Sequence, residues 1–147
     1  MPAHARFEYF GAPEKTAAVW RHTSDGDEFT VGDLGWIDDD GYLYLAGRRE
    51  DLVITGGVNV YPAEVENTLA EHPGVIDVAV YGVPDEEWGQ RVVAAYVGDA
   101  DPAELAGWAR ERLAPAKRPK SLHPVGELPR TSTGKVRRLD LPQVLGL

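Results

Sequence analysis

Residues 75–83 read VIDVAVYGV and residues 91–97 read RVVAAYV. Both stretches are nearly continuous apolar runs, which are typical of strands covered on both faces. A polar loop, residues 84–90 (PDEEWGQ), separates them. These two stretches decide the fold, because they predict the central strands of a sheet with other elements packed on each side.

Two helices are predicted around these strands. Pro62 fits the first position of a helix in which Val65 and Leu69 recur at helical spacing. A second helix is expected after Asp101, a favourable N-cap residue with Glu104 at the capping-box position. The stripe that this second helix is expected to bury consists of Leu105, Trp108, Ala109 and Leu113.

The C-terminal third gives weaker patterns. Residues 117–125 predict an edge strand that Pro119 and Pro124 interrupt. Residues 136–145 predict a short terminal helix.

Upstream of residue 56 the sequence predicts mostly strands. After a short helix expected over residues 14–20, residues 28–31 read as one strand. Residues 42–46 read as its return strand after a tight turn at residues 38–41. A further strand, residues 51–54, is expected to end at the Gly56-Gly57 pair.

A domain boundary is expected between Arg49 and Glu50. The strands before it have little to cover them, whereas residues 50–147 alternate strands and helices in a way that can close a small α+β domain. We therefore expect residues 1–49 to be a β-rich, incomplete part of a larger domain and residues 50–147 to be a domain with a central few-stranded sheet flanked by helices.

Composition and charge limit the function classes. The chain of 147 residues has a net charge of −9, yet residues 110–147 hold nine basic and only three acidic residues. A basic segment on an acidic protein favours an anionic small ligand or an acidic partner surface. Nucleic acid is not favoured, because the basic residues are not interleaved with aromatic residues and no recognition motif is present.

Metal and membrane chemistry are not indicated either. The chain has no cysteine, so disulfides and thiolate metal sites are excluded and a cytoplasmic location is expected. Its four histidines are scattered and suggest no metal site. No apolar run approaches the roughly 18 residues that a transmembrane helix needs.

Residues 129–135 read PRTSTGK and place one lysine at the end of a short polar loop. The ammonium of Lys135 is a compact charge on a flexible stem, which suits a bridge between two anions such as a carboxylate and a phosphate. A solvated turn is the alternative. The phosphate-loop pattern is not met, because Pro129 and Val136 occupy the places of its first glycine and its hydroxyl residue.

Four stretches in order resemble the motifs of the adenylate-forming enzymes, which include acyl-CoA synthetases, peptide-synthetase adenylation domains and luciferases. The stretches are residues 29–35 (FTVGDLG), 47–51 (GRRED), 56–66 (GGVNVYPAEVE) and 129–135 (PRTSTGK). From about Phe7 to Leu141 the chain is most similar to the C-terminal portion of bacterial fatty-acyl or aryl-CoA ligases.

The resemblance implies a two-step chemistry. In that family a large N-terminal domain binds ATP and an organic acid, and a small C-terminal domain swings between two orientations. One orientation makes an acyl-adenylate and the other lets CoA attack it. The chain resembles the last strands of the large domain followed by the whole small domain.

The resemblance also implies roles for individual residues around the nucleotide. Lys135 aligns with the catalytic lysine of adenylation. Asp33 aligns with the carboxylate that binds the ribose hydroxyls, and Arg48 with an arginine that reaches the nucleotide; a polar turn residue and an exposed charge are the alternatives. Glu50 holds the hinge position, where most relatives have Asp or Lys.

The remaining implied residues concern CoA. Gly56 and Gly57 match glycines beside the pantetheine tunnel, where a plain turn is also compatible. Trp88 resembles an aromatic residue on which the CoA adenine stacks, with packing on its own loop as the alternative. Basic residues expected to meet the CoA phosphates, or alternatively to protect an edge strand, are Lys117, Arg118 and Lys120.

The sequence leaves three functions open. The first is the mobile part of an ATP-dependent acid–CoA ligase that uses ATP with Mg, a carboxylic acid and CoA; alone, the chain is expected to be inactive and to bind neither nucleotide tightly. It requires a large AMP-binding domain, in cis or in trans.

The second function is a stand-alone docking or regulatory module for a separate AMP-binding subunit. Both predict an exposed apolar patch along residues 7–46. The third is a nucleic-acid-binding tail that uses Arg130, Lys135, Arg137 and Arg138.

Overall fold

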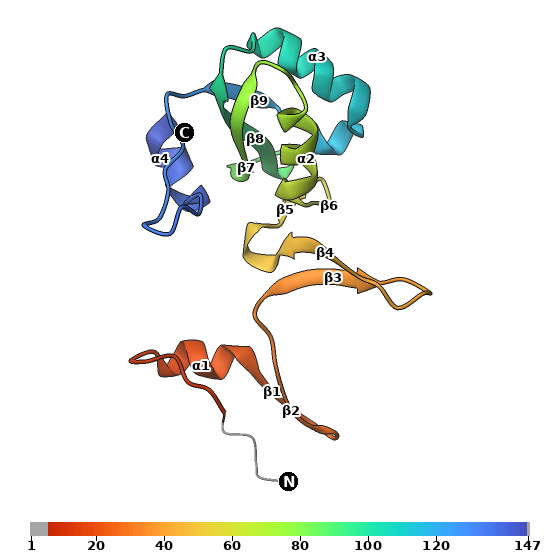
Figure 1. Ribbon diagram of the computed structural model, residues 1–147, viewed down its shortest axis with the longest axis vertical. Coiled ribbons are helices and arrows are strands. Elements are labelled where there is room, and N and C mark those ends of the chain that lie inside the picture. Colours follow the sequence, from red (N-terminus) through yellow and green to blue (C-terminus); the bar gives the residue numbers. More distant parts are fainter. Residues whose placement is uncertain (1–5, 147) are drawn as a thin grey trace. The chain divides into compact units, whose positions relative to one another are not determined.

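The computed structural model describes residues 6–146. These residues fall into two compact units, the first ending at Asp33 and the second beginning at Leu34 (Figure 1). Each unit is described separately.

The first unit is small and has no buried residue among those described. Helix α1 (Pro13–Val19), which the sequence predicts over residues 14–20, leads into the hairpin of β1 (Trp20–Thr23) and β2 (Gly26–Phe29). Around this hairpin the rings of Phe7, Tyr9, Trp20 and Phe29 contact one another with centroids 5.2–5.6 Å apart.

The strand predicted over residues 28–31 lies instead at Gly26–Phe29. Its partner is β1 and not the predicted return strand, so that pairing prediction is wrong. The return strand β4 (Leu43–Arg48) pairs with β3 (Asp33–Ile37), which the sequence prediction missed. Gly35 makes this pairing possible, because a Cβ there would lie 2.4 Å from the Tyr44 carbonyl oxygen. The predicted turn at residues 38–41 is present; the backbone N–H of Tyr42 donates to the Asp38 carboxylate and holds the pKa of Asp38 below its usual range.

The predicted exposed apolar patch is also present. Trp36 and Tyr44 stack with their centroids 5.3 Å apart, yet both side chains remain about half exposed. Neighbouring large apolar side chains that are exposed are Ile37, Tyr42, Leu43 and Leu45.

The second unit is built on a five-stranded sheet. Its central hairpin consists of β7 (Val75–Asp85) and β8 (Gly89–Gly98), paired antiparallel from Val75↔Gly98 to Asp85↔Gly89. The two predicted central strands are confirmed, and they extend into the predicted loop. The other edge of β8 pairs with β5 (Val53–Thr55) at one end and with β9 further along, and β6 (Val58–Val60) pairs with β5.

Strand β9 (Ser121–Pro124) is shorter than the strand predicted over residues 117–125 and runs parallel to β8. Pro115–Lys117 forms a 3-10 turn, η2, instead. The strand ends at Pro124, and just beyond it the Val125 N–H still donates to the Tyr96 carbonyl of β8 at 2.8 Å.

Two layers cover the sheet, as the continuous apolar runs predicted. On one face lie α2 (Pro62–Ala70) and α3 (Pro102–Arg112), and Figure 1 shows both on the same side of β7 and β8. The Asp101 carboxylate caps α3 by accepting from the Ala103 and Glu104 N–H groups. The core of this face includes Val53, Val60, Val65, Leu69, Val80, Val92, Tyr96, Leu105 and Ala109.

The opposite face is covered by the C-terminal segment, which contains the 3-10 turn η3 (Arg138–Asp140) and helix α4 (Leu141–Leu145) (Figure 1). Its core consists of Ala79, Tyr81, Val83, Val93, Ala95, Leu128 and Leu141. The α+β class predicted from the sequence is confirmed. No helix within residues 6–146 has the length and apolarity to cross a bilayer.

Candidate functional site

Lys135 stands at the end of a braced turn. The Thr131 N–H donates to the Lys135 carbonyl at 2.8 Å, the Gly134 N–H donates to the Thr131 carbonyl at 2.9 Å, and the Lys135 N–H donates to Thr131 Oγ1 at 3.1 Å. Gly134 has a φ of +85°, a conformation that only glycine adopts without strain. The backbone of the turn is therefore fixed by its own hydrogen bonds.

The turn is also tied to the central sheet. The Arg130 guanidinium donates to the Gly134 carbonyl at 2.6 Å and forms an ion pair with Asp77 of β7. Arg130 and Val136 form an antiparallel bridge that closes the base of the turn. A mobile side chain is thus carried on a rigid backbone.

The Lys135 side chain is exposed. From residue 112 to residue 146 it is the one basic side chain without an ion pair, hydrogen bond or ring contact to another described residue. The others are paired with carboxylates, backbone carbonyls or a tryptophan ring: Arg112, Lys117, Arg118, Lys120, Arg130, Arg137 and Arg138. Five of these side chains, Arg112, Lys117, Arg130, Arg137 and Arg138, are paired with carboxylates, whereas Arg118 and Lys120 keep their charge and contact neutral groups.

Glu50, the predicted hinge residue, lies in a 3-10 turn, η1 (Arg49–Asp51), which we call the hinge turn. The strand predicted over residues 51–54 had included Asp51, the last residue of this turn. The Leu52 N–H donates to the Arg49 carbonyl at 3.3 Å and closes this turn. The Glu50 side chain is 76% exposed, and its Oε1 lies 3.7 Å from the Arg48 guanidinium. Glu50 can therefore reorient without breaking a buried contact.

A groove of about 320 Å³ joins the hinge turn to the Lys135 turn. Its lining includes Glu50, Asp51, Thr131, Lys135, Val136 and Arg138. The structure thus brings together two of the predicted site residues, Lys135 and Glu50, that are 85 positions apart in the sequence.

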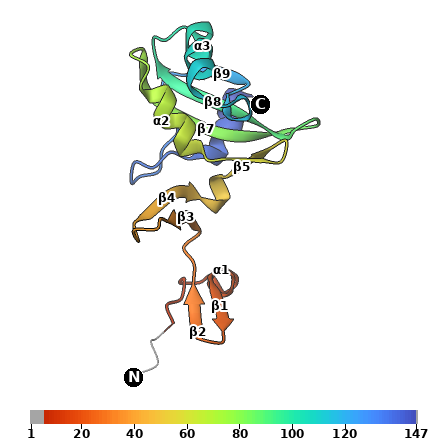
Figure 2. The same ribbon diagram turned by 90° about the vertical axis from the view of Figure 1, so that its right-hand side faces the viewer.

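A second group of predicted residues meets at the tip of the β7–β8 hairpin. Figure 2 shows this tip next to the end of β5. The Gly56 N–H donates to the Trp88 carbonyl at 2.9 Å, and the Lys120 ammonium lies 5.1 Å from the centre of the Trp88 ring. Gly56 and Gly57 have φ values of +55° and +78°. We name Gly56, Gly57, Trp88 and Lys120 the tryptophan corner.

Gly56 is required at the tryptophan corner on two grounds. A Cβ at this position would lie 2.8 Å from Trp88 Cε3, closer than any ordinary carbon contact. Its positive φ is also unfavourable for any other residue. Trp88 is 42% exposed, so part of this residue remains accessible to solvent beside its contacts with the glycine turn and the Lys120 ammonium.

Lys117 and Arg118 are engaged elsewhere. The Lys117 ammonium donates to both carboxylate oxygens of Glu64, at 2.6 and 2.8 Å. The Arg118 guanidinium donates to the carbonyls of Arg110 and Leu113, at 2.9 Å each, and so caps the C-terminal end of α3. These contacts favour structural roles for both residues.

Asp33 and Arg48 lie at strand ends. Asp33 is the first residue of β3 and closes the first unit, whereas Arg48 is the last residue of β4 in the second unit. Both are exposed. Among the described residues, no group of three or more His, Asp or Glu side chains is arranged to hold a metal ion.

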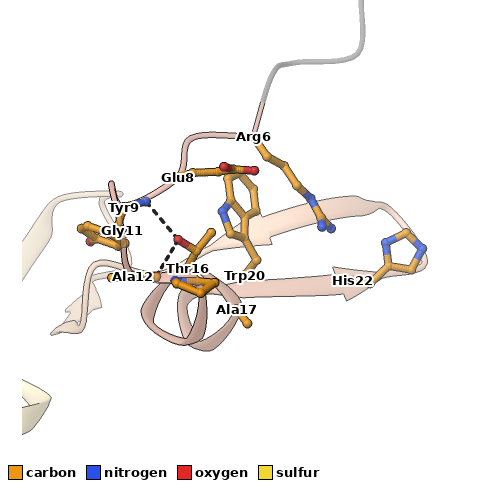
Figure 3. A pocket seen from close by; sticks show the side chains of 10 residues that line it. Arg6, Glu8, Tyr9, Gly11, Ala12, Thr16, Ala17, Trp20 and His22 are labelled. Carbon is orange, nitrogen blue, oxygen red and sulfur yellow. Dashed lines mark hydrogen bonds between the residues drawn. The ribbon is translucent and has the colours of Figure 1, made fainter.

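The first unit has a larger hollow of about 570 Å³ (Figure 3). The polar groups at its wall are used internally: the Tyr9 N–H donates to Thr16 Oγ1, Thr16 Oγ1 donates to the Ala12 carbonyl, and Trp20 Nε1 donates to the Phe7 carbonyl. Arg6 and His22 at its wall contact Asp27, and Glu8 also lines the hollow, whereas none of the predicted site residues does.

Sequence reasoning missed the role of Arg138. Its guanidinium donates to both oxygens of Glu66, at 2.8 and 2.9 Å, and to Asp51 at 3.3 Å. In the sequence alone, Arg138 stands out only as part of a basic tail. No local pattern could have found these partners, because they lie 72 and 87 positions away.

Comparison with known proteins agrees with this geometry. Residues 64–135 match the sequence model of the AMP-binding enzyme C-terminal domain. The chain is 46% identical over 134 residues to a long-chain-fatty-acid–CoA ligase of Bacillus subtilis, covering 88% of this chain and 23% of the relative. It is 48% identical over 126 residues to a 2-succinylbenzoate–CoA ligase of Bacillus licheniformis, covering 84% of this chain and 26% of that relative. The chain thus spans about a quarter of the length of these relatives.

Solved structures show the same likeness. The crystal structure of ATP-bound MatB from Rhodopseudomonas palustris superposes with a TM-score of 0.81 at 42% identity, over 92% of this chain and 27% of that one.

Proposed function

Through residues 64–135 this chain belongs to the AMP-binding, adenylate-forming enzymes, and we propose that it supplies the mobile C-terminal part of an ATP-dependent acid–CoA ligase. In this role it gives Lys135 to an active site formed with a large AMP-binding domain, in cis or in trans. The tryptophan corner then faces CoA.

One observation carries the proposal: Lys135 is an unpaired, exposed ammonium on a braced turn, in a segment whose other basic side chains are paired. A lysine that held the fold together through an ion pair would have a partner within its own domain. A lysine that acts in another domain's cleft has to be free of such partners and held on a stable backbone.

The chemistry explains why a cation is needed there. In the first half-reaction a carboxylate oxygen attacks the α-phosphorus of ATP, an acyl-adenylate forms, and pyrophosphate leaves with the electrons of the broken P–O bond. Two anions must approach each other. The Lys135 ammonium lowers their repulsion and stabilises the charge that develops in the transition state.

In the second half-reaction the CoA thiol gives up its proton, its sulfur attacks the acyl carbon, and AMP leaves. We propose that Trp88 offers its open ring face to the CoA adenine and that Lys120 meets a CoA phosphate. Gly56 and Gly57 give the pantetheine arm close passage along the backbone. Lys117 and Arg118 were also expected to meet phosphates; their contacts to Glu64 and to α3 make Lys120 the stronger candidate.

The remaining proposed roles concern the nucleotide and the hinge. Asp33 accepts hydrogen bonds from the ribose diol, because two carboxylate oxygens match two hydroxyls. Arg48 reaches the nucleotide, and Glu50 is the pivot of the swing. ATP is used with Mg. Neither ATP nor CoA binds tightly to this chain alone, and a cytoplasmic setting is consistent with its lack of cysteine.

The test is complementation. The chain is assayed alone and after fusion to that portion of the Bacillus subtilis relative which it does not match, with acid-dependent pyrophosphate release as the measurement. We expect no activity alone and clear activity in the fusion. Activity of the chain alone would refute the role proposed here, and so would a folded fusion that stays inactive with a panel of fatty and aryl acids.

The exposed apolar patch on β3 and β4 fits equally well a second candidate, a module that docks on a separate AMP-binding subunit. Restored ligation on mixing two separate polypeptides, without fusion, would favour this candidate. A nucleic-acid-binding tail receives less support, because Arg130, Arg137 and Arg138 are paired with carboxylates of the chain itself.

A further inference from the structure

Arg138 lies three residues after Lys135 and links three separate elements. Its guanidinium binds Glu66 of α2 through both carboxylate oxygens and also reaches Asp51 of the hinge turn η1. Glu66 Oε1 in turn accepts from the Val80 N–H of β7 at 2.8 Å. One side chain therefore connects the hinge, the helix layer and the central sheet.

The three side chains are largely shielded from water. Exposed fractions are 25% for Arg138, 28% for Asp51 and 16% for Glu66. A two-point guanidinium–carboxylate contact of this kind is geometrically specific and resists displacement better than an exposed pair. Removing one partner would leave a shielded charge unpaired, which would raise the free energy of the folded state.

The contact divides the hinge turn into two halves. Asp51 is held to the body of the second unit, whereas Glu50 beside it is 76% exposed and its ionic neighbour is Arg48, on the upstream side. A small cavity of about 140 Å³ lies under the turn, lined among others by Glu50, Asp51, Tyr81 and Arg138. The backbone before Asp51 can therefore rotate while the backbone after it stays in place.

We propose that Arg138 is a positioning residue that fixes the downstream half of the hinge turn, so that the swing of the domain is confined to the backbone up to Glu50. Lys135 then moves with the pivot as one rigid body and arrives in the same place on each cycle. A hinge needs a few residues that absorb the dihedral change and rigid segments on either side. Because a misplacement of about 1 Å can cost roughly 100-fold in rate, a defined pivot matters for catalysis.

The catalytic part of this inference rests on the proposed function, whereas its structural part can be tested without any substrate. Amide hydrogen exchange is measured on the whole chain for the unaltered protein and for Arg138→Met, Arg138→Lys and Asp51→Asn. The matched control is Arg137→Met, because Arg137 is the adjacent arginine, its side chain is 55% exposed, and it forms an ion pair with Asp140 outside the hinge turn.

We expect Arg138→Met and Asp51→Asn to speed exchange in the peptide that covers residues 49–54 by about tenfold, since a tenfold change corresponds to the loss of one good charged contact. Exchange in β8 should stay unchanged. Arg138→Lys should give an intermediate rate, because an ammonium can bridge the carboxylates only with fewer bonds. Arg137→Met should behave like the unaltered chain.

Two results would overturn the inference. One is an unchanged exchange rate of the hinge peptide in Arg138→Met. The other is a rise of the exchange rate in β8 as large as that in the hinge peptide, which would mean that Arg138 stabilises the whole domain and not the hinge turn in particular. In the active fusion, Arg138→Met should lower kcat of both half-reactions with KM for ATP unchanged, and rates equal to those of Arg137→Met would also overturn it. A fusion that is inactive with the unaltered chain would count against the proposed function, while the exchange experiment still decides the structural part.

Discussion

Arg130 and Asp77 form an ion pair that fastens the Lys135 turn to β7 of the central sheet. The same guanidinium donates to the Gly134 carbonyl, one residue before the lysine. The backbone position of Lys135 is therefore tied to the sheet, although its four-carbon side chain remains free to move.

Replacing Arg130 by Met removes both contacts and should loosen the turn. In the active fusion we expect acyl-adenylate formation to fall by about tenfold, because the lysine is less well placed. Pyrophosphate release under saturating ATP measures this step. Arg137→Met is the control and should keep the full rate; an Arg130→Met rate equal to that of this control would show that the ion pair does not position Lys135.

Gly56→Ala should destabilise the second unit by about 1–2 kcal/mol, because alanine is unfavourable at a φ of +55° and its Cβ would meet Trp88. The free energy of unfolding is measured by urea titration. Gly107→Ala, in α3 with no atom within 4 Å of an added Cβ, should instead stabilise by about 0.5–1 kcal/mol. If Gly56→Ala and Gly107→Ala changed the free energy of unfolding in the same direction, the backbone conformation described for these two glycines would be contradicted.

Lys120→Ala should raise KM for CoA by about tenfold and leave KM for ATP unchanged, because the loss of one charge-assisted hydrogen bond is worth about 1–2 kcal/mol. Initial rates of thioester formation at varied CoA give the comparison. Lys117→Ala is the matched variant and should keep the KM for CoA, since Lys117 is bound to Glu64. The reverse result would move the phosphate contact from Lys120 to Lys117.

Tyr81 should make stability fall at alkaline pH. Burial raises the pKa of its phenol from 10.0 to about 12, so the folded state keeps a proton that the unfolded state releases first. This contribution is complete below pH 10 and is lost as pH rises toward 12, by up to about 2–3 kcal/mol.

The measurement is the free energy of unfolding between pH 7 and pH 12. Tyr81→Phe should show a smaller alkaline loss than the unaltered chain, and at pH 7 it should differ by less than about 1 kcal/mol, because the hydroxyl has no hydrogen-bond partner among the described residues. Tyr42→Phe, at a 68% exposed position, is the control. Parallel pH curves for all three proteins would mean that Tyr81 titrates normally.

The sequence predicts the body of the second unit well. Residues 75–83 and 91–97 are apolar on both faces, and such strands can be buried only between two layers. Asp101 and Pro62 mark helix starts by local chemistry, which needs no knowledge of distant residues. The family motifs are local as well, and they indicate Lys135, Gly56 and Trp88 as candidate site residues without knowledge of the fold.

Other features depend on contacts that the local pattern does not contain. Strand β3 was missed because Gly35 and Asp33 are poor strand residues, and only the close approach of Tyr44 explains the glycine. The positions of Lys117 and Arg118 in the sequence suggested a phosphate site, yet Glu64 and the end of α3 bind them. Arg138 finds Asp51 and Glu66 only after the chain has folded.

The central claim is that Lys135 acts in adenylation within another domain's active site. Its most direct test compares Lys135→Ala with the unaltered chain in the active fusion, measuring acid-dependent pyrophosphate release and, separately, thioester formation from supplied acyl-adenylate. We predict that pyrophosphate release falls by about 100-fold or more, while thioester formation keeps a rate close to that of the unaltered fusion. Pyrophosphate release at the unaltered rate would contradict the claim.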